Sequence, residues 1–475
     1  MEEKYIAAID LGSSQITLSV AKISGEDIQI LYYKKTPSDG IRNSAVFNPG
    51  KATGPIKAAI EEAERELKIK ILQVVVGLPR CDIRQETSKA KVERSNPDES
   101  IVKEEVENLK SLALNDYPLQ NPEQEIIYGA IAQSFSDDEQ FQLIESDIIG
   151  VISRNFEGNF KLFIGKSSYV RTIDKLFNGL GIAIAKKYFT PISQAKVVLT
   201  SDEIASGVAL IDIGGGATSV TIYKDNILRH YASIPFGGNV ITRDIMNECR
   251  VNEKLAENIK LAFGACIPEK LQTLGEKIIQ IEGEEFGGFK QIPVKYLSEV
   301  ITARVKEIAD AIFYEMQQSG LADSLRGGVV LTGGGAELTN IALYIKDLSG
   351  YNVRIGYPRK KFSASGQNGI FEPNSSTSLG MILSAKEDEL TSCLDKPVAP
   401  KVENENPFIE VDKESEEVQG DGQLFTDDEV PVEERQKESQ KKPKKNKTGF
   451  LKVTWDKLIN FVDDMSKDIS DDQNV

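Results

Sequence analysis

The amino-acid sequence predicts an α/β protein made of two lobes that share one plan, and three observations support this fold class. Short apolar runs alternate with stretches in which apolar residues recur at helical spacing, which is typical of layered α/β folds. The outline of the first strand and its glycine turn returns within residues 208–223, which indicates a duplication. At 475 residues, the chain is also too long for a single hydrophobic core.

The first lobe is predicted to begin with strands. Tyr5–Asp10 is a short apolar strand, and Ile16–Ile23 and Ile28–Lys34 alternate between apolar and polar residues like its antiparallel partners. Pro55–Leu67 repeats apolar residues at helical spacing and predicts a helix. Val74–Gly77 has the composition of a buried strand.

After Pro79 the pattern of apolar and polar residues changes, and the new pattern indicates a small inserted α+β module. A helical stretch, Ile101–Leu114, is followed by the strand-like runs Ile126–Ile131 and Phe160–Ile164. The α/β pattern of the first lobe then resumes with the helix Tyr169–Leu180.

The second lobe repeats the opening of the first. Val208–Asp212 is an apolar strand that ends in aspartate, and Ser219–Tyr223 alternates like its partner. After Lys386 the composition shifts to Glu, Asp, Lys, Pro and Gln, which cannot bury enough apolar surface to offset the entropy of ordering. The predicted division is a first lobe (1–83 and 168–200), an inserted domain (84–167), a second lobe (201–387), a disordered tether (388–447) and an amphipathic helix (448–466).

Three glycine-rich turns, each after an apolar strand, predict a phosphate-binding cleft between the lobes. Glycine permits positive φ and lets an anion approach the backbone amides, while serine and threonine hydroxyls can donate to phosphate oxygens. The third turn leads into a predicted helix, whose N-terminus favours anions. The candidate residues are, in the first turn, Asp10, Gly12, Ser13, Ser14 and Gln15; in the second, Asp212, Gly214, Gly215, Gly216, Ala217 and Thr218; in the third, Gly333, Gly334 and Gly335.

Asp10 and Asp212 would repel a bare phosphate at the ends of their strands. They would favour phosphate binding if they hold Mg²⁺ through its water shell, so both are candidate metal ligands. Asp212 is also the candidate catalytic residue.

Other kinds of site are excluded or disfavoured. There is no G-x-x-x-x-G-K-[ST] stretch, and no G-x-G-x-x-G opens a helix after the first strand. The net charge of −16 argues against nucleic-acid binding. The one histidine, His230, rules out a multi-histidine metal site, and the four cysteines are far apart without a CxxC pair.

The three turns resemble the phosphate-1, phosphate-2 and adenosine motifs of the superfamily that contains actin, sugar kinases and heat-shock chaperones. Four further stretches resemble the FtsA family within it: Pro235–Thr242, Ala256–Lys260, Val353–Pro358 and Ser378–Gly380. The resemblance covers about residues 4–386 in order, plus the terminal helix. It implies a duplicated actin-like (ribonuclease H-like) fold, with a small α+β (SHS2-like) domain inserted in the first lobe.

The resemblance also implies ligands and partners. ATP with Mg²⁺ would be the cofactor, and Gly238, Glu257 and Lys260 would join the nucleotide site, the last two at the ribose. The protein would polymerise, bind the C-terminal tail of FtsZ through residues of about 245–320, and recruit further division proteins through the insert. It would work at the division site, on the cytoplasmic face of the cell membrane.

Two departures from the family pattern bear on hydrolysis. Many FtsA sequences have lysine where this chain has Gln15, which can donate a hydrogen bond but brings no charge to the phosphates. Hydrolytic relatives often have an acid at the position of Thr190, where it helps to position the attacking water. We therefore expect ATP binding with, at most, slow hydrolysis.

The end of the chain predicts a membrane-binding helix. Lys441, Lys442, Lys444, Lys445 and Lys447 form a basic cluster at the end of an acidic chain. After it, an apolar helix face contains Phe450, Leu451, Trp455, Leu458, Ile459, Phe461 and Val462. Such a helix can also occupy a protein groove. The long tether and the lysines, which are attracted to anionic lipid, favour a membrane.

Two alternative functions remain on the same fold. A sugar or acetate kinase would need a catalytic aspartate facing a second pocket, for which no motif is recognisable, and it would leave the terminal helix unexplained. An actin-like pilus-assembly protein would share the insert but not the long tether with its amphipathic end.

Overall fold

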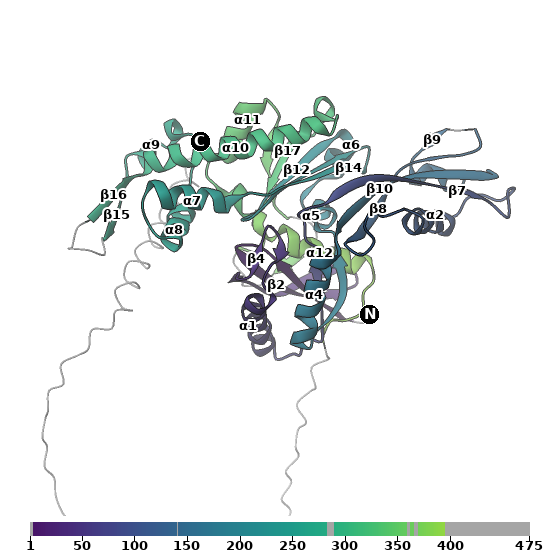
Figure 1. Cartoon of the computed structure of the whole chain (residues 1–475), viewed down its shortest axis with the longest axis horizontal. Coiled ribbons are helices and arrows are strands. Elements are labelled where there is room, and N and C mark those ends of the chain that lie inside the picture. Colours follow the sequence, from purple (N-terminus) through teal and green to yellow (C-terminus); the bar gives the residue numbers. More distant parts are fainter. Residues whose placement is uncertain (1–2, 140, 283–288, 359–361, 365–368, 395–475) are drawn as a thin grey trace, which may run out of the picture. The chain divides into compact units, whose positions relative to one another are not determined.

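The computed structural model of the chain describes residues 3–139, 141–282, 289–358, 362–364 and 369–394 (Figure 1). The predicted terminal helix and most of the predicted tether lie outside these residues. In the part of the chain that is described, no helix is both long and apolar enough to cross a membrane.

Two sheets with the same strand order confirm the predicted duplication. In each, three consecutive strands form an antiparallel meander, and two later strands add in parallel beside the first of them. The five shared strands have the order β3-β2-β1-β6-β11 in the first lobe and β14-β13-β12-β17-β18 in the second. In the first lobe a sixth strand, β19 (Phe362–Ala364), lies beside β3. The bounds are β1 Lys4–Leu11, β2 Gln15–Ser24, β3 Asp27–Pro37, β6 Gln73–Gly77, β11 Ala183–Tyr188, β12 Val208–Ile213, β13 Thr218–Lys224, β14 Ile227–Ile234, β17 Val329–Thr332 and β18 Val353–Ile355.

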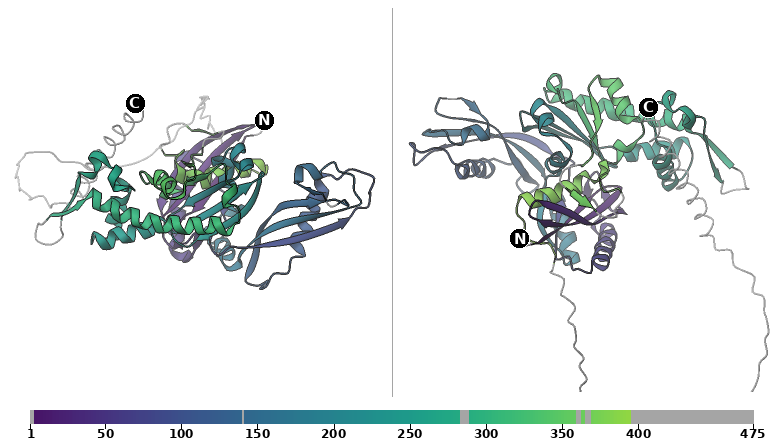
Figure 2. Two further views of the ribbon diagram at one scale, coloured as in Figure 1. Left: turned by 90° about the horizontal axis from the view of Figure 1, so that it is seen from above. Right: turned by 180° about the vertical axis from the view of Figure 1, so that it is seen from behind.

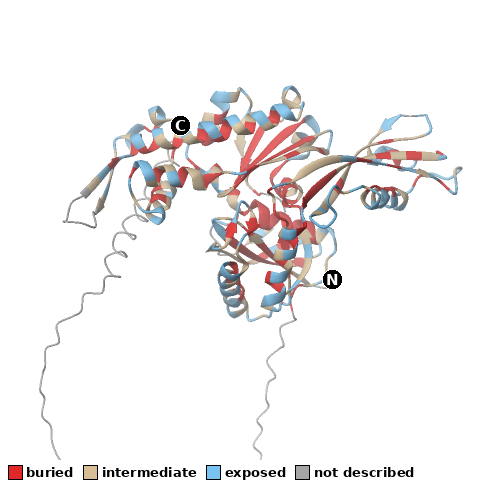
Figure 3. Ribbon diagram, in the orientation of Figure 1, coloured by how far each residue is buried: buried red, intermediate tan, exposed pale blue. Residues whose placement is uncertain are grey.

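Local sequence explains the helices of the first lobe. Helix α1 (Pro49–Leu67) begins where the Asn48 side chain accepts the Lys51 amide at 3.2 Å, with proline at the first helical position. It buries a stripe of alanine and isoleucine against the sheet (Figure 3). Helix α4 (Ser167–Leu180) ends at Gly181, which takes the left-handed conformation.

Residues 84–166 form a separate sheet with its own apolar core. The order is β7-β10-β8-β9, with bounds β7 Arg84–Glu93, β8 Glu125–Ser136, β9 Gln142–Leu143 and β10 Asn155–Lys166. Helix α2 (Lys103–Asn115) lies against one face of this sheet (Figures 1 and 2) and buries Val106 and Leu109 there. We call this sheet with its helix the insert; its limits as a domain remain a prediction.

The remaining elements complete the insert, the two lobes and their connections. The helices are α3 Glu145–Ile148, α5 Thr190–Val198, α6 Ser201–Ser206, α7 Gly238–Glu248, α8 Glu253–Phe263, α9 Gln272–Gly275, α10 Val294–Gln318, α11 Ile341–Ser349 and α12 Ser376–Glu387. The short strands are β4 Ile41–Arg42, β5 Ala45–Val46, β15 Ile278–Glu282, β16 Phe289–Pro293 and β19 Phe362–Ala364.

The predicted boundaries of the second lobe and the tether need correction. β19 pairs in parallel with β3, and α12 contacts β1, β2, β6 and α5, so both lie with the first lobe although they fall within 201–387. Residues 388–394 are not part of a solvated tether either. Cys393 and Leu394 are buried, and the Cys393 amide donates to the Tyr5 carbonyl at 2.7 Å. Their apolar side chains are a short exception to the polar composition of the tail.

Candidate functional site

The first two glycine turns meet face to face. A Cβ atom on Gly215 would overlap the Ser14 hydroxyl, and one on Gly216 would lie 2.6 Å from the Ser13 hydroxyl. The Ser14 hydroxyl donates to the Asn239 side chain at 2.8 Å. Glycine is needed here for space, because neither Gly215 nor Gly216 has a positive φ. The two turns, which come from different lobes, therefore lie directly against each other.

Asp212, at the end of β12, is buried and held from three sides. Its Oδ2 atom accepts a hydrogen bond from the Gln194 side chain at 2.8 Å and forms an ion pair with the Arg80 guanidinium. On the third side a Cβ atom on Gly333, whose φ is +81°, would overlap Oδ1. The second and third turns thus come together at this carboxylate.

Arg80 and Gln194 have roles that the sequence did not reveal. Arg80 follows β6, so its side chain reaches the same sheet edges as Asp10 and Asp212. Gln194 lies on α5, and its amide also donates to the Thr377 hydroxyl at 2.8 Å. Position after a strand was the one available signal for Arg80, and Gln194 carried no signal.

Asp10 and Asp212 form an acidic pair with Arg80 as its counter-charge. Burial raises the pKa of the Asp10 carboxyl to about 6; Arg80 opposes this rise, and the negative charge of Asp212 adds to it. Burial lowers the pKa of the Arg80 guanidinium, but the two carboxylates outweigh burial and leave it raised overall. The two neighbouring carboxylates therefore favour the binding of a positive charge at this site.

The donor set fits Mg²⁺, which takes one or two carboxylates and completes its shell with water and phosphate oxygens. Within the described residues, no group of three or more His, Cys, Asp or Glu side chains could hold a metal ion by itself. A cation at Asp10 and Asp212 would therefore complete its shell with water, and with phosphate oxygens when a nucleotide is bound.

Helices α7 and α8 place the predicted ribose residues beside the second turn. The first amides of α7, from Gly238 and Asn239, donate to the carbonyls of Gly214 and Gly215 at 2.8 Å each. Lys260 pairs with Glu257 at 2.7 Å and donates to the Gly238 carbonyl at 3.2 Å. Glu257 and Lys260 are thus fixed against the helix that rests on the phosphate turn.

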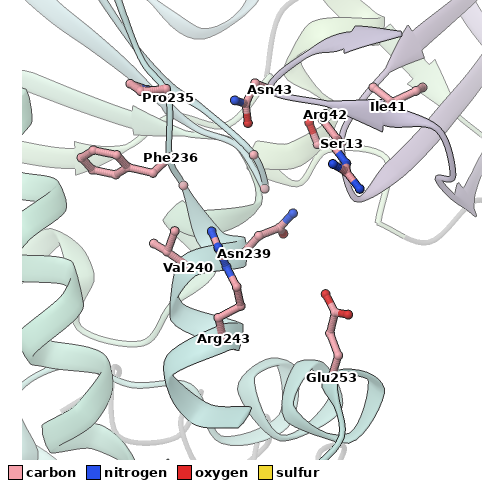
Figure 4. A pocket seen from close by; sticks show the side chains of 13 residues that line it. Ser13, Ile41, Arg42, Asn43, Pro235, Phe236, Asn239, Val240, Arg243 and Glu253 are labelled. Atoms are coloured by element: carbon pink, nitrogen blue, oxygen red, sulfur yellow. The ribbon is translucent and has the colours of Figure 1, made fainter. Parts of the chain in front are cut away.

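A cavity of about 430 Å³ opens beside the turns (Figure 4). Arg42 and Asn43, from the hairpin of β4 and β5, line it on the side of the first lobe. Asn239 and Arg243 from α7 line it on the other side. These four side chains were not among the predicted site residues, and each adds hydrogen-bond donors to a polar cavity.

The third turn and Thr218 are placed differently from expectation, and the structure also defines the surroundings of Gln15 and Thr190. The third turn leads into a short 3-10 turn, Gly334–Glu337, so it provides no α-helix N-terminus; α11 begins only later. The Thr218 hydroxyl is fully buried and donates to the Phe236 carbonyl at 2.9 Å, so it does not face the cleft. Gln15 is exposed at the start of β2. Thr190 is buried, and its hydroxyl has no hydrogen-bond partner among the described residues.

The insert, whose chain leaves the first lobe, is hydrogen-bonded to the second lobe's edge strand β14. The side chains of Gln85, Gln133 and Lys161 bond to its backbone, and the Tyr231 hydroxyl donates to the Arg80 carbonyl at 2.7 Å. His230, on the same strand, is half-buried.

Comparison with solved structures shows an actin-like fold. The chain resembles a PilM-PilN type IV pilus biogenesis complex with a TM-score of 0.54 and 14% identity, over 80% of this chain and 98% of the other. It resembles MreB5 of Spiroplasma citri, solved with ADP, with a TM-score of 0.50 and 14% identity, over 81% and 97%. At this level of sequence identity, the likeness shows that the folds are similar and nothing further.

Sequence comparison gives the family. A family model described as "Cell division protein FtsA" matches residues 209–380. The FtsA protein of Neisseria meningitidis serogroup B is 29% identical over 388 residues, which are 81% of this chain and 91% of that protein. The FtsA protein of Borreliella burgdorferi is 28% identical over 408 residues, 86% of this chain and 96% of that protein. With the paired lobes, the insert and the facing glycine turns, these matches show that the chain belongs to the FtsA family of actin-like cell division proteins.

Proposed function

We propose that the cleft binds ATP with Mg²⁺ and that the protein tethers the FtsZ ring to the inner face of the cell membrane. The observation that carries the first part is the convergence of two serine hydroxyls, two facing glycine turns and an acidic pair whose Asp212 is buried. Such a set offers donors to phosphate oxygens and carboxylates to a cation. MreB5, which shares the fold, was solved with ADP.

Each residue of the cleft has a defined part in this proposal. Ser13 and Ser14 donate to phosphate oxygens, and the backbones of Gly214–Gly216 and Gly333–Gly335 lie close to the nucleotide. Asp10 and Asp212 hold Mg²⁺, which neutralises phosphate charge when it is bound. Gln194 keeps the Asp212 carboxylate in place at 2.8 Å. Lys260 and Glu257 bind the ribose.

We expect slow ATP hydrolysis because two positions of the cleft do not have the charged residues that would promote it. Thr190 is buried and neutral where an acid would orient the attacking water, and Gln15 brings no positive charge to the phosphates. We expect turnover far below about 1 s⁻¹, the lower end of typical enzyme rates.

The variant Asp10→Asn tests the nucleotide site. It keeps the size of the side chain but removes a charge that a cation would need, so affinity for a fluorescent ATP analogue in Mg²⁺ should fall at least about tenfold. Asp27→Asn, an exposed change at the start of β3, is the matched control. Equal affinity for both variants, or turnover at metabolic-kinase rates, would contradict this part of the proposal.

The membrane part of the proposal rests on the sequence of the tail, outside the described residues. The apolar face with Trp455 inserts among the lipids, and the lysines at 441–447 are each worth about 1 kcal/mol near an anionic surface. The acidic stretch before them is repelled by the same surface and keeps the lobes away from it.

Flotation with anionic vesicles tests the tail. The full chain should float, and a chain that ends at Gln440 should remain in the lower fraction. Replacing Lys441, Lys442 and Lys444 with glutamine should weaken flotation most at low salt, because screening already weakens attraction at high salt. Undiminished flotation of the shortened chain would show that the tail is not the anchor.

FtsZ binding is proposed for the region of α8, α10 and the β15–β16 hairpin. Leu261 on α8 is 65% exposed and Ile278 on β15 is 53% exposed, so this region presents apolar side chains to a partner. The double variant Leu261→Ser/Ile278→Ser should bind an FtsZ tail peptide at least about tenfold more weakly in fluorescence anisotropy. Leu72→Ser, at 51% exposure in the first lobe, is the control. Equal binding by the double variant would move the FtsZ site elsewhere.

Self-association into filaments and recruitment of later division proteins through the insert complete the proposal. Sedimentation of the full chain without vesicles, with and without ATP, tests polymerisation. A chain that stays in the supernatant under both conditions at high protein concentration would speak against filaments.

A further inference from the structure

Within the residues that the structure describes, Arg80 is the one arginine that pairs with a carboxylate of the acidic pair, that of Asp212. Its side chain is only 13% exposed, and that of its partner Asp212 only 5%. Arg80 follows β6, in the chain segment that leads from the first lobe into β7 of the insert. Its backbone carbonyl accepts the Tyr231 hydroxyl of β14 at 2.7 Å. One residue therefore touches the cleft with its side chain and the second lobe's edge strand with its backbone.

Two neighbouring carboxylates, of which one is buried, need a positive charge nearby. Without one, their repulsion and desolvation would be costly. The Arg80 guanidinium supplies this charge: it is paired with Asp212, and Asp10 lies close enough to feel both charges. The chain thus carries its own cation at the place where the proposed function puts a divalent one.

We infer that Arg80 is a built-in counter-ion of the Asp10–Asp212 pair, and that it must leave Asp212 before a divalent cation can be held there. This inference rests on the proposed nucleotide site. Arg80 is a positioning residue in this role: it raises the Mg²⁺ concentration that nucleotide binding requires, and it keeps the nucleotide-free cleft stable.

Movement of Arg80 away from Asp212 would affect the insert through a series of contacts. The Arg80 carbonyl holds the Tyr231 hydroxyl, and the Tyr231 backbone is bonded to Gln85 of β7 by two hydrogen bonds, at 2.9 Å and 2.5 Å. Phe189 and Phe163 pack on the Tyr231 ring. A shift of the backbone at Arg80 therefore acts on the contact between the second lobe and the insert.

The first test is a Mg²⁺ titration without nucleotide, read by thermal unfolding of the full chain. Arg80→Gln removes the charge but keeps hydrogen-bonding atoms. We expect Mg²⁺ to raise the melting temperature of Arg80→Gln, and to have little effect on the wild type or on Arg80→Lys. If Arg80→Gln does not fold alone, Mg²⁺ should restore its folded signal. An identical response of wild type and Arg80→Gln, or no recovery of an unfolded variant, would overturn the inference.

The second test measures the Mg²⁺ concentration at half-maximal binding of a fluorescent ATP analogue. It should fall on the order of tenfold in Arg80→Gln, within the usual range of coupling between sites. Arg354→Gln removes another partly buried arginine, paired with Glu203 at 2.6 Å, and should leave this value unchanged. Loss of nucleotide binding in Arg80→Gln at saturating Mg²⁺ would make Arg80 a phosphate ligand and overturn the inference.

The two tests separate this inference from the proposed function. Failure of the wild type to bind nucleotide at any Mg²⁺ concentration would defeat the proposed function, while the nucleotide-free titration would still decide whether Arg80 excludes a cation. Nucleotide binding with the same Mg²⁺ requirement in wild type and Arg80→Gln would defeat the inference alone.

Discussion

The side chain of Gln85 forms a two-way hydrogen-bonded pair with the backbone of Tyr231. Its amide donates to the Tyr231 carbonyl at 2.5 Å, and its oxygen accepts the Tyr231 amide at 2.9 Å. Gln133 reaches the Leu228 carbonyl at 2.9 Å, further along the same strand. These side chains take the place of a neighbouring strand on the open edge of β14, where unpaired backbone groups would otherwise need water.

Replacing Gln85 with alanine should open this edge. The Tyr231 amide loses its acceptor, and we expect the free energy of unfolding to fall by about 1–3 kcal/mol. Hydrogen exchange should become faster at Tyr231 while the amides of β12 stay protected. Gln142→Ala, an exposed change on β9 of the same insert, is the control. Unchanged exchange at Tyr231 would show that Gln85 does not hold the strand.

A methyl group at Gly215 should force the two phosphate turns apart. Its Cβ atom would overlap the Ser14 hydroxyl, so Gly215→Ala should cost about 1–3 kcal/mol of stability and weaken nucleotide binding. Adding Ser14→Gly removes the overlapping atom and should restore part of the melting temperature. Gly54→Ala, in α1 with nothing within 4 Å of its Cβ position, should be neutral or stabilising. Independent, additive effects of Gly215→Ala and Ser14→Gly would contradict the contact.

His230 should make the protein less stable as the pH falls below its ordinary titration range. Burial, aided by the positive charge of Lys161, lowers the pKa of His230 from 6.5 to about 4. Between these values the unfolded chain takes up a proton that the folded chain does not, so the free energy of unfolding decreases as the pH falls. Allowing for solvent screening at a half-buried site, we expect a loss of about 1–2 kcal/mol between about pH 7 and about pH 4.

His230→Gln should remove this part of the pH dependence, as measured by urea unfolding at several pH values. Because the chain has one histidine, its ring proton signals in NMR can be followed without assignment. A titration midpoint near 6.5 in the folded protein would refute the expected shift.

Arg94 should be the main polar anchor of the insert. Its buried guanidinium bonds to both carboxylate oxygens of Glu105, at 2.8 and 2.9 Å, and to the carbonyls of Glu99, Ser100 and Ser153. Arg94→Met leaves these acceptors without a donor and should cost about 3 kcal/mol. Limited proteolysis should then cut within 84–166 before it cuts elsewhere. Arg65→Met, exposed on α1, should behave like the wild type.

The strands and helices that the sequence predicted are those with a strong local pattern. β1 and β12 each contain an apolar run with an aspartate as the next-to-last residue, and α4 was expected at Tyr169–Leu180, close to its observed bounds. β19 could not be predicted, because it has three residues and its pairing partner Ile28–Ile30 lies more than 300 positions earlier. α12 is buried at ten successive positions, so it has no polar face to reveal its neighbours.

The same contrast holds for the candidate site. The glycine turns with Asp10 and Asp212 form a pattern that repeats, and the structure brings them together. Arg80 and Gln194 are single residues without a recurring motif, and their positions at Asp212 appear only when β6, α5 and β12 are assembled. The buried Thr218 hydroxyl shows the opposite case, since residue type alone does not tell which way a side chain points.

The hydrogen bond from the Cys393 amide to the Tyr5 carbonyl has a consequence for the order of folding. Residues near the C-terminal end of the described chain complete the first lobe. They supply its edge strand β19, its buried helix α12 and the segment whose Cys393 amide bonds to β1. The second lobe's sheet lies within 208–355, an uninterrupted stretch. During synthesis the lobe that emerges first is therefore completed last, after the second lobe has left the ribosome. Until then β1 and β3 have exposed apolar surface, and this interval is when a chaperone or a neighbouring nascent chain can reach it.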